Sequence, residues 1–382
     1  MAINPYKSML LKVDWFTLVI DPKNDVDLNG ERFNLLTYLG YDFEDFEKLS
    51  NGRFFLNSGV TLGNYVNVYY DDPSLQISKY SSHLVVYTFT GQGSTSLAKL
   101  LMKKYKTDDW EKAWINFFKF LKTKQAHCTR IDLAIDDYFG ALDLFRMERK
   151  LRAGEYRSSK RRYNIIKQMD TSGSVKGFSI YLGQSRGKVS KVGNYYVRYY
   201  DKRAQYLEKN QILPKEVENI ETGGGSHHWV RAEIAFQKLK AQECIDKIVE
   251  HGSFGYVYRG AMRHIVEFLV KPRIANSNKS RWKVCDWWEA FLDGAKDLKL
   301  SNPERDADIG SLLKWLRISV VGTLQLLERI GKKKNFDIYS LIDSLDQYEF
   351  SKKQERVYNE SLKMSDTEIK GYLEQFIEGD YK

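Results

Sequence analysis

The sequence predicts an α+β protein, with a β-sheet domain in residues 1–272 and a helical region in residues 280–382. Up to about residue 270, short segments rich in β-branched and aromatic residues alternate with Gly, Asn, Asp and Ser, a pattern typical of strands and turns. Past residue 280, apolar side chains instead recur at helical spacing. Helical segments also interrupt the strands, so we expect an antiparallel or mixed sheet with flanking helices. The polar stretch 271–280 is the predicted boundary.

Each expected element follows from the period of its apolar residues. In the segment 109–122, for example, Trp110, Trp114 and Phe117 fall on one face of a helix. The expected strands are residues 13–20, 54–56, 65–70, 83–89, 129–136, 177–182, 195–200 and 229–236. The expected helices are residues 94–105, 109–122, 142–152, 237–249, 281–298, 309–330, 340–345 and 367–377.

The composition favours a polyanionic partner. The formal charge is +10, from 60 Lys and Arg against 50 Asp and Glu, and basic side chains that neutralise phosphates release counterions. The 25 Tyr, 20 Phe and 8 Trp either fill an aromatic-rich core or also stack on unpaired bases. The composition alone is compatible with both uses.

Several classes of protein are not supported by the sequence. The cysteines Cys128, Cys244 and Cys285 are too widely spaced for a disulfide framework or a zinc cluster. The sequence has neither histidine pairs at metal-binding spacing nor the Gly-x-x-x-x-Gly-Lys-Ser/Thr motif of a phosphate-binding loop. It shows no apolar run long enough for a membrane span and no signal peptide, so we expect a cytoplasmic protein without membrane contact.

Residues 129–137 carry two carboxylates at strand spacing. Side chains of a strand alternate between its faces, so Asp132, Ala134 and Asp136 share one face. The small residue between the carboxylates leaves room for a hard cation, and oxygen ligands suit Mg²⁺ or Mn²⁺. We therefore predict that Asp132 and Asp136 bind a divalent cation. Alternatively, they form the ordinary polar face of a half-exposed strand.

A second strand-like segment, residues 195–202, concentrates tyrosines beside cations. Its Tyr196, Arg198 and Tyr200 share one face. A tyrosine hydroxyl is a poor nucleophile at its ordinary pKa of about 10, so a nearby cation or base must favour the phenolate. Cations would also stabilise the charged transition state of phosphodiester attack. The other interpretation is a tyrosine-rich strand whose cations extend to solvent.

The loop before this strand is rich in Lys, Gly and Ser. Such a loop can follow a phosphate backbone, because its side chains are basic and its backbone is unconstrained. We therefore expect DNA contacts from Arg186, Lys188 and Lys191.

A third strand, residues 229–236, places Arg231 and Glu233 on one face. If this face adjoins that of the two aspartates, Glu233 supplies a third carboxylate to the cation. Alternatively, Arg231 and Glu233 form structural ion pairs with neighbouring strands. His228, directly before the strand, is a weaker candidate for activating the tyrosine.

Taken in order, these segments resemble the Rep_trans family. That family comprises replication initiators of small rolling-circle plasmids from Gram-positive bacteria, relaxases of some integrative conjugative elements, and replication proteins of some phages. Each segment is short, but their order and spacing together are fairly specific, and they span about residues 10 to 270. The resembling segments are residues 14–16, 90–93, 130–137, 181–186, 197–202 and 231–233, and the Trp287-Trp288 pair resembles the family's C-terminal part.

The resemblance implies a sheet-based nicking domain in which a tyrosine becomes covalently joined to a 5′ phosphate. It also implies a divalent cation held by carboxylates. The family pattern puts Tyr200 in the reactive position, with Arg198 and Lys202 beside it. Because this segment contains four tyrosines, Tyr196 and Tyr199 are further candidates for the nucleophile.

We therefore expect a metal-dependent enzyme that nicks and rejoins single-stranded DNA at a rolling-circle origin, with Mg²⁺ or Mn²⁺ as cofactor. Single-stranded and hairpin origin DNA would be its partner, contacted by Arg130 and Arg231 among others. The helical region, with the basic stretch 332–334, is expected to serve duplex recognition, homodimer formation or contact with a host helicase. Two alternatives stay open: a conjugative relaxase with the same chemistry, and a non-catalytic DNA-binding regulator.

Overall fold

The computed structural model divides the chain into two compact units, Met1–Ser301 and Asn302–Lys382. It describes residues 9–21, 34–72, 74–75, 84–183, 195–213, 215, 217–218, 227–272, 278–294, 296, 298, 300, 309, 312–313, 316–317, 320–344, 352–362 and 364–378. Within these ranges, every helix is too short or too polar to cross a lipid bilayer.

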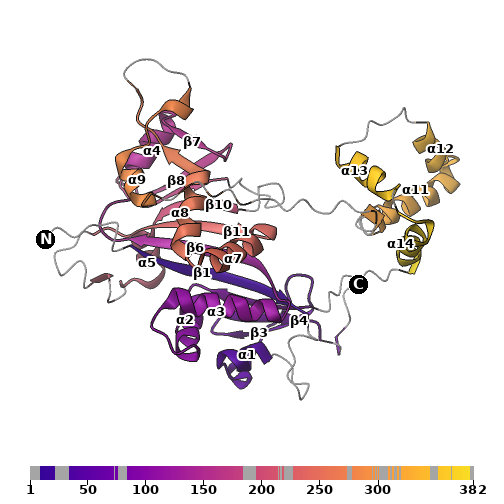
Figure 1. The fold of residues 1–382 in the computed structure, drawn as a ribbon, viewed down its shortest axis with the longest axis horizontal. Helices are drawn as coiled ribbons and strands as arrows, with labels where there is room; N and C mark the ends of the chain where they lie inside the picture. The colour runs from indigo at the N-terminus through magenta and orange to yellow at the C-terminus, as the bar shows by residue number, and fades with distance from the viewer. Residues whose placement is uncertain are drawn as a thin grey trace. The chain divides into compact units, whose positions relative to one another are not determined.

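The first unit is built on a ten-stranded antiparallel sheet (Figure 1). The strands are β1 (Leu10–Ile20), β2 (Glu47–Lys48), β3 (Ser58–Leu62), β4 (Val66–Tyr70), β5 (Val85–Thr90), β6 (His127–Asp137), β8 (Tyr163–Met169), β9 (Val175–Leu182), β10 (Tyr195–Asp201) and β11 (Val230–Gln237). Their order across the sheet is β2-β3-β4-β5-β1-β6-β11-β10-β9-β8. Two short strands, β7 (Tyr156–Ser158) and β12 (Val266–Phe268), pair separately.

Helices of the first unit cover one face of this sheet, with α2, α3 and α7 in front of the strands in Figure 1. The described helices are α1 (Asn34–Leu39), α2 (Gln92–Lys104), α3 (Trp110–Thr123), α4 (Leu144–Arg152), α5 (Lys202–Asn210), α7 (Leu239–His251), α8 (Phe254–Ile265) and α9 (Asp286–Leu292). Aromatic side chains join the layers: the rings of Phe16 on β1 and Trp114 on α3 lie 5.4 Å apart, edge to face. Each such buried ring contributes about 2 kcal/mol or more of hydrophobic free energy.

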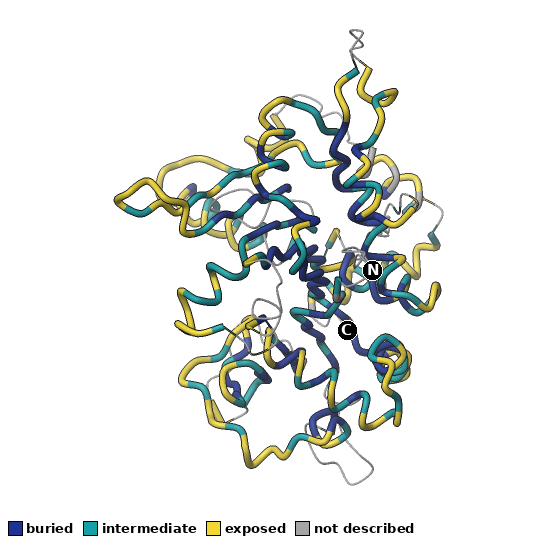
Figure 2. The backbone as a smooth tube through the Cα atoms, turned by 90° about the vertical axis from the view of Figure 1, so that its left-hand side faces the viewer, coloured by how far each residue is buried: buried dark blue, intermediate teal, exposed yellow. Residues whose placement is uncertain are grey.

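Alternation along the central strands separates an apolar face from a polar one. On β6, Ile131 and Leu133 are fully buried in the apolar core beneath the helices. Asp132 and Asp136 alternate with these residues along the strand and therefore point to the opposite face of the sheet. Figure 2 shows the buried residues concentrated along the central strands and the inward sides of the helices. The polar face is where the candidate site lies.

The α+β class and most predicted elements are confirmed. Among the described α-helices and strands, nine were not predicted: α1, α5, α8, α13, β2, β3, β7, β8 and β12. Glycines weaken the pattern of two of these elements: β3 contains Gly59 and is followed by Gly63, and α8 contains Gly255 and Gly260. Their identity is fixed by tertiary packing, since β3 pairs with β4 and α8 lies in the apolar core.

The predicted strand at residues 54–56 is wrong, because these residues form a tight turn. The amide of Leu56 donates a hydrogen bond of 3.0 Å to the carbonyl of Arg53. The two central residues, Phe54 and Phe55, have φ angles of 59° and 69°. Phenylalanine pays about 1 kcal/mol or more in this left-handed region, which glycine and asparagine tolerate. The aromatic composition of residues 54–56 therefore predicted a strand where the chain forms a turn.

The first unit extends beyond the boundary predicted at residues 271–280, because α9 packs on it. Trp288 is fully buried, its indole ring lies edge to face with Phe268 at 4.9 Å, and its Nε1 donates to the carbonyl of Val266 at 3.1 Å. The apolar residues that indicated a separate helical region thus complete the core of the first unit. The compact units divide instead after Ser301.

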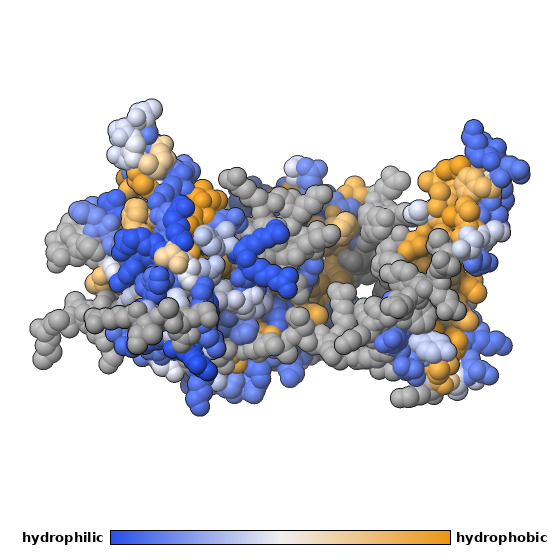
Figure 3. Space-filling view, turned by 90° about the horizontal axis from the view of Figure 1, so that it is seen from above, coloured by the Kyte–Doolittle hydropathy of each residue, from blue (hydrophilic) through white to orange (hydrophobic). Residues whose placement is uncertain are grey.

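The second unit is helical in its described residues. Its helices are α11 (Val321–Lys334), α12 (Ile338–Asp343), α13 (Lys352–Ser361) and α14 (Asp366–Glu378). Hydrophobic side chains lie on its surface (orange in Figure 3), among them Leu326, Leu362 and Ile377. Among the described residues of this unit, Val357 is the single hydrophobic side chain that is buried.

Candidate active site

The register of three strands brings the predicted site residues together on the polar face. Strand β11 lies between β6 and β10 and pairs with both. The opposed residues form three rows across β6, β11 and β10: Asp136, Arg231 and Tyr200; Ala134, Glu233 and Arg198; Asp132, Ala235 and Tyr196. The acidic strand and the tyrosine strand are thus one strand apart, and Glu233 occupies the centre of the arrangement.

Arg231 holds two aspartates in a buried ion cluster. Its Nε and Nη2 donate to the carboxylate of Asp136 at 2.6 and 2.9 Å, and its Nη1 donates to Asp14 at 2.7 Å. Lys12 adds a contact to Asp136 at 2.6 Å. Burial opposes ionisation of Asp136, but Arg231 and Lys12 outweigh it and hold the pKa of this carboxyl at about 2. The cluster is therefore charged at neutral pH.

Asp14 joins this cluster because of an irregularity in β1. The pairing of β1 with β6 shifts between Val13 and Trp15, so that Asp14 is an extra residue in the strand. Bulges of this kind redirect a side chain, and they are frequent beside functional sites. Asp14 and Lys12 were not among the predicted site residues. The signal that could have found Asp14 is a carboxylate within an otherwise apolar strand.

A second group surrounds Glu233. Asp132 accepts a bidentate hydrogen bond from Arg130 at 3.0 and 2.6 Å, and Arg130 also stacks on Trp15 at 3.9 Å from the ring centroid. Glu233 is fully buried and accepts from Arg198 at 2.7 Å through Oε2. Burial raises the pKa of Asp132 to about 7, the charge of Glu233 adds to the rise, and Arg130 opposes it. Arg231 and Glu233 thus pair with neighbouring strands rather than with each other.

Glu233 retains one carboxylate oxygen for a ligand. Among the described residues, its Oε1 is buried and has no hydrogen-bond partner. A buried carboxylate oxygen without a partner costs free energy, and a cation would satisfy it. Glu233 lies diagonally from Asp132 across the β6–β11 pair, where Cα atoms are about 7–8 Å apart. This pair fits a cation that takes one or two carboxylates and completes its shell with water and phosphate oxygens.

Asp136 does not fit the same cation. It lies four positions after Asp132 on β6, which places their Cα atoms about 13 Å apart at the rise of a strand. Within the described residues, no group of three His, Cys, Asp or Glu side chains is placed to hold a metal ion. The structure therefore does not bring Asp132, Asp136 and Glu233 together as one set of ligands: of the other two carboxylates, Glu233 is the one that lies near Asp132.

The tyrosines of β10 lie in different environments. Tyr199 faces the helices, is fully buried in the apolar core, and donates its hydroxyl to the sulfur of Met262 at 2.9 Å. Such a phenol has no route to a phosphate, so Tyr199 is removed from the candidates. Tyr200 and Tyr196 point to the polar face, where Tyr200 is 4% exposed and Tyr196 is half-buried.

Cations surround the phenol of Tyr200. The Arg198 guanidinium carbon lies 4.8 Å and the Lys202 Nζ 5.7 Å from the centroid of its ring. Burial raises the pKa of Tyr200 above its ordinary value, while Arg231 and Arg198 lower it. Burial, together with the nearby Arg231, lowers the pKa of Lys202 to about 8. A neutral amine is therefore accessible beside this phenol near physiological pH.

The remaining predicted residues are placed as follows. Arg130 and Arg231 lie inside the charged groups described above. Arg186, Lys188 and Lys191 lie outside the residues that the structure describes. His228 contacts Asp137 at 3.2 Å, and Asp137 lies on the face of β6 opposite to Asp136. The structure therefore does not bring His228 to Tyr200.

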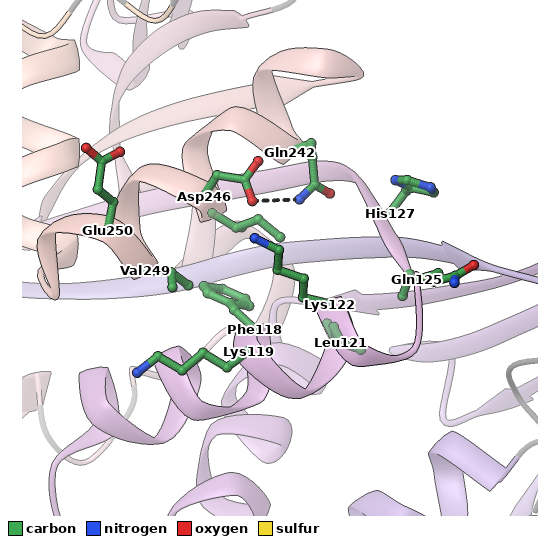
Figure 4. A pocket seen from close by; sticks show the side chains of 12 residues that line it. Phe118, Lys119, Leu121, Lys122, Gln125, His127, Gln242, Asp246, Val249 and Glu250 are labelled. Atoms are coloured by element: carbon green, nitrogen blue, oxygen red, sulfur yellow. Dashed lines mark hydrogen bonds between the residues drawn. The ribbon is translucent and has the colours of Figure 1, made fainter.

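A hollow of about 800 Å³ lies between α3 and α7, on the helical side of the sheet (Figure 4). Lys119 and Lys122 line it from α3, and Asp246 and Glu250 line it from α7. The tyrosines of β10 and the carboxylates of Asp132 and Glu233 do not line it. The hollow is thus distinct from the candidate active site.

The fold and the site together define an α+β protein whose sheet carries ion-paired carboxylates beside tyrosines on its polar face. More particularly, the chain belongs to the replication initiation factor family, Rep_trans, whose sequence profile matches residues 126–342. The family membership predicted from the sequence is thereby confirmed.

Two individual proteins are similar over most of the chain. A protein of Bacillus subtilis (strain 168) that carries the name DNA relaxase NicK is 25% identical over 314 residues, which cover 80% of each chain. The solved structure of a rolling circle replication initiator protein from Geobacillus stearothermophilus has a TM-score of 0.55 and 21% identity. It matches 77% of this chain and 99% of its own, and this second likeness concerns the fold.

Proposed function

We propose that this replication initiation factor nicks one strand of DNA at a rolling-circle origin and later rejoins it, through a covalent phosphotyrosine. The observation that supports the proposal is the three-strand arrangement on the polar face, in which Tyr200 lies beside arginines and next to Glu233. The names of the relatives, a relaxase and a rolling circle initiator, agree with such chemistry. A relaxase that starts conjugative transfer would use the same residues in the same way.

In the proposed reaction, the hydroxyl oxygen of Tyr200 attacks the scissile phosphorus, and the bond from phosphorus to the 3′ oxygen breaks. The products are a free 3′ hydroxyl, which can prime synthesis, and a 5′ phosphate esterified to the tyrosine. One phosphodiester replaces another, so the bond energy is kept without ATP. A later 3′ hydroxyl reverses the step, releases the tyrosine and closes the strand.

The residues around Tyr200 have separate roles in this proposal. Arg198 and Arg231, whose charges act on Tyr200, would stabilise the negative charge that develops on the phosphate, as fixed cations in a dry site do. Lys202 in its neutral form accepts the proton of the phenol. Tyr200 is 4% exposed. The side chains that cover it must therefore move before the DNA phosphate can reach its hydroxyl.

Asp132 and Glu233 are the residues that would hold Mg²⁺ or Mn²⁺. A bound cation would polarise the scissile phosphate and neutralise part of its charge. Glu233 is suited to this role by the oxygen left without a partner, and Asp132 by its position across the strand pair. Arg130 and Trp15 fix the orientation of Asp132.

Tyr196 is a second candidate for the nucleophile, because it is less buried than Tyr200. It lies diagonally from Glu233, as Tyr200 does, and the charges of Asp132 and Glu233 act on it. Burial, the largest influence, raises its pKa, and Asp132 raises it further. Tyr200 is preferred because the family pattern puts it in the reactive position and because Lys202, the proposed proton acceptor, lies beside its ring.

A covalent adduct tests the proposed function. The protein is incubated with Mg²⁺ or Mn²⁺ and a 3′-end-labelled single strand of DNA that contains an inverted repeat from the DNA flanking its gene, and it is then separated on a denaturing gel. Radioactivity that migrates with the protein supports a tyrosine nicking enzyme. Binding in a native gel without any covalent band would instead support the alternative of a non-catalytic DNA-binding regulator.

We assign the nicking chemistry to the first unit and partner binding to the helical second unit. The basic end of α11, residues 332–334, and the exposed apolar side chains of this unit support contact with duplex DNA, a second copy or a host helicase. A homodimer is the expected assembly, and light scattering of the purified chain measures it.

We expect adduct formation to rise with pH and to level off above about pH 8. The amine of Lys202 accepts a proton only in its neutral form, and its pKa of about 8 sets the midpoint. Initial rates measured from pH 6 to 9.5 test this, and Lys202→Met should flatten the curve. Lys209→Met, at the exposed end of α5, is the matched control. A rate that falls above pH 8 would show that Lys202 acts as a cation instead.

We expect Glu233→Gln to raise the concentration of Mn²⁺ that gives half-maximal adduct formation by about tenfold or more. The amide keeps the shape of the side chain and a partner for Arg198, but it removes the charge that attracts the cation. Calorimetric titration of Mn²⁺ into the DNA-free protein gives a readout independent of activity. Glu250→Gln on the exposed side of α7 should leave both values unchanged. An unaltered Mn²⁺ requirement in Glu233→Gln would contradict the two-carboxylate site.

A further inference from the structure

The turn at residues 53–56 has an unusual combination of sequence and backbone. Both central residues, Phe54 and Phe55, have positive φ, the pattern of a type I′ turn, in which Asn-Gly is the preferred pair. Two adjacent phenylalanines in this conformation are strained, and such strain is frequently found at ligand-binding positions. Phe55 is also 76% exposed, so burial of its ring does not offset the strain.

The base of the turn is held firmly against the sheet. Leu56 is buried and packs with Tyr69 and Val86, and the ring of Phe54 meets Tyr69 edge to face at 5.4 Å. Asn57 then fastens the end of the turn to the end of β4, since its Nδ2 donates to the carbonyl of Asp72 and its Oδ1 accepts from the Asp72 amide at 2.7 Å. The exposed ring of Phe55 is therefore presented by an anchored backbone.

The turn lies on the same face of the sheet as the candidate active site. Tyr69, Val86 and Val19 are opposed across β4, β5 and β1. Val19 shares a face with Trp15, which stacks on Arg130 beside Asp132. Counting strands and residues, the turn is roughly 20 Å from Asp132, a span of about six stacked nucleotides at 3.4 Å each.

We propose that this turn binds an unpaired base of the DNA strand that reaches the active site, with the ring of Phe55 as the stacking surface. The inference rests on the proposed function, which places single-stranded DNA on this face. An exposed aromatic ring suits a base in any sequence, because every base has a π face. Arg53, exposed and 5.3 Å from the centroid of the Phe54 ring, supplies positive charge for the adjoining phosphate.

Phe55→Gly tests the proposal, because stability and binding should change in opposite directions. Glycine relieves the positive φ, so the melting temperature should stay the same or rise by about 2 °C. Binding of a fluorescein-labelled oligothymidylate at low salt, followed by anisotropy, should weaken roughly five- to a hundredfold. Phe55→Trp should bind as tightly as the unaltered protein. A 2-aminopurine in the strand should change its emission with the unaltered protein and not with Phe55→Gly.

Tyr256→Gly, on the exposed side of α8 among the helices, is the control for loss of an aromatic ring. The proposal is overturned if Phe55→Gly binds the oligothymidylate as the unaltered protein does, or if the unaltered protein does not bind it at all. It is also overturned if the melting temperature and the affinity fall together, because Phe55 would then serve the fold. Adduct formation at saturating DNA is measured in parallel. If the unaltered protein forms the adduct and Phe55→Gly binds the oligothymidylate normally, this inference alone is rejected. If the unaltered protein forms no adduct, the proposed nicking is rejected.

Discussion

Replacing Tyr200 by phenylalanine is expected to reduce covalent protein–DNA adduct formation by a factor on the order of a thousand or more. The substitution removes the oxygen that would form the bond to phosphorus and keeps the ring between Arg198 and Lys202. Binding of single-stranded DNA should change less than twofold, because the charged groups of the site remain. The measurement is the initial rate of the radiolabelled adduct on a denaturing gel, with affinity measured in parallel.

Tyr196→Phe is the matched control for this prediction, since Tyr196 lies on the same face of the same strand and is also diagonal to Glu233. It should retain most of the adduct-forming rate. Tyr199→Phe should retain it as well, because that hydroxyl contacts Met262 inside the core. If Tyr196→Phe abolishes the adduct and Tyr200→Phe does not, the nucleophile is Tyr196. If neither substitution matters, the chemistry proposed for this face is wrong.

The faces of the three site strands could be predicted from the sequence, because alternation along a strand is a local property. Asp132 and Asp136 share a face, as predicted, and Tyr200 and Arg198 share one too. The spacing of residues in one strand, however, does not say which residues of other strands lie opposite them. Strand order and register therefore had to come from the structure, and they place Glu233, which was a conditional third ligand, diagonally beside Asp132 and leave Asp136 farther along β6.

The partners of the charged residues could not be predicted for the same reason. Arg231 pairs with Asp14, which is 217 positions away in the sequence and reaches it only through the irregularity in β1. The turn at Phe54 and Phe55 was hidden for a different reason. Aromatic residues favour strands, and the local composition carried no glycine or asparagine at the two positions of positive φ. Its conformation is imposed by the packing of Leu56 and the hydrogen bonds of Asn57.

Replacing Arg231 by methionine is expected to lower the free energy of unfolding of the first unit by about 3–5 kcal/mol. Arg231 is 4% exposed and neutralises Asp14 and Asp136, so its removal leaves two carboxylates inside the protein with Lys12 as the remaining cation. Urea unfolding followed by tryptophan fluorescence measures the change. This signal reports mainly on the first unit, because all but one of the tryptophans precede residue 302.

The difference between the unaltered protein and Arg231→Met should shrink as the pH falls from about 4 to about 2. The pKa of Asp136 in the folded protein, about 2, lies below its unfolded value, so the ionised form stabilises the fold above that unfolded value. This contribution, on the order of 2 kcal/mol, is lost on acidification towards the folded pKa. Arg231→Met lacks most of this stabilisation already at neutral pH, so acidification should lower its stability less.

Two further variants separate the loss of charge pairing from the loss of packing. Arg152→Met removes a surface arginine, 65% exposed and paired with Glu148, and should cost less than about 1 kcal/mol. Adding Asp136→Asn to Arg231→Met should restore part of the stability, because it removes one of the unpaired buried charges. If the double variant is less stable than Arg231→Met alone, the cost arises from packing on the polar face, and the electrostatic account of this cluster fails.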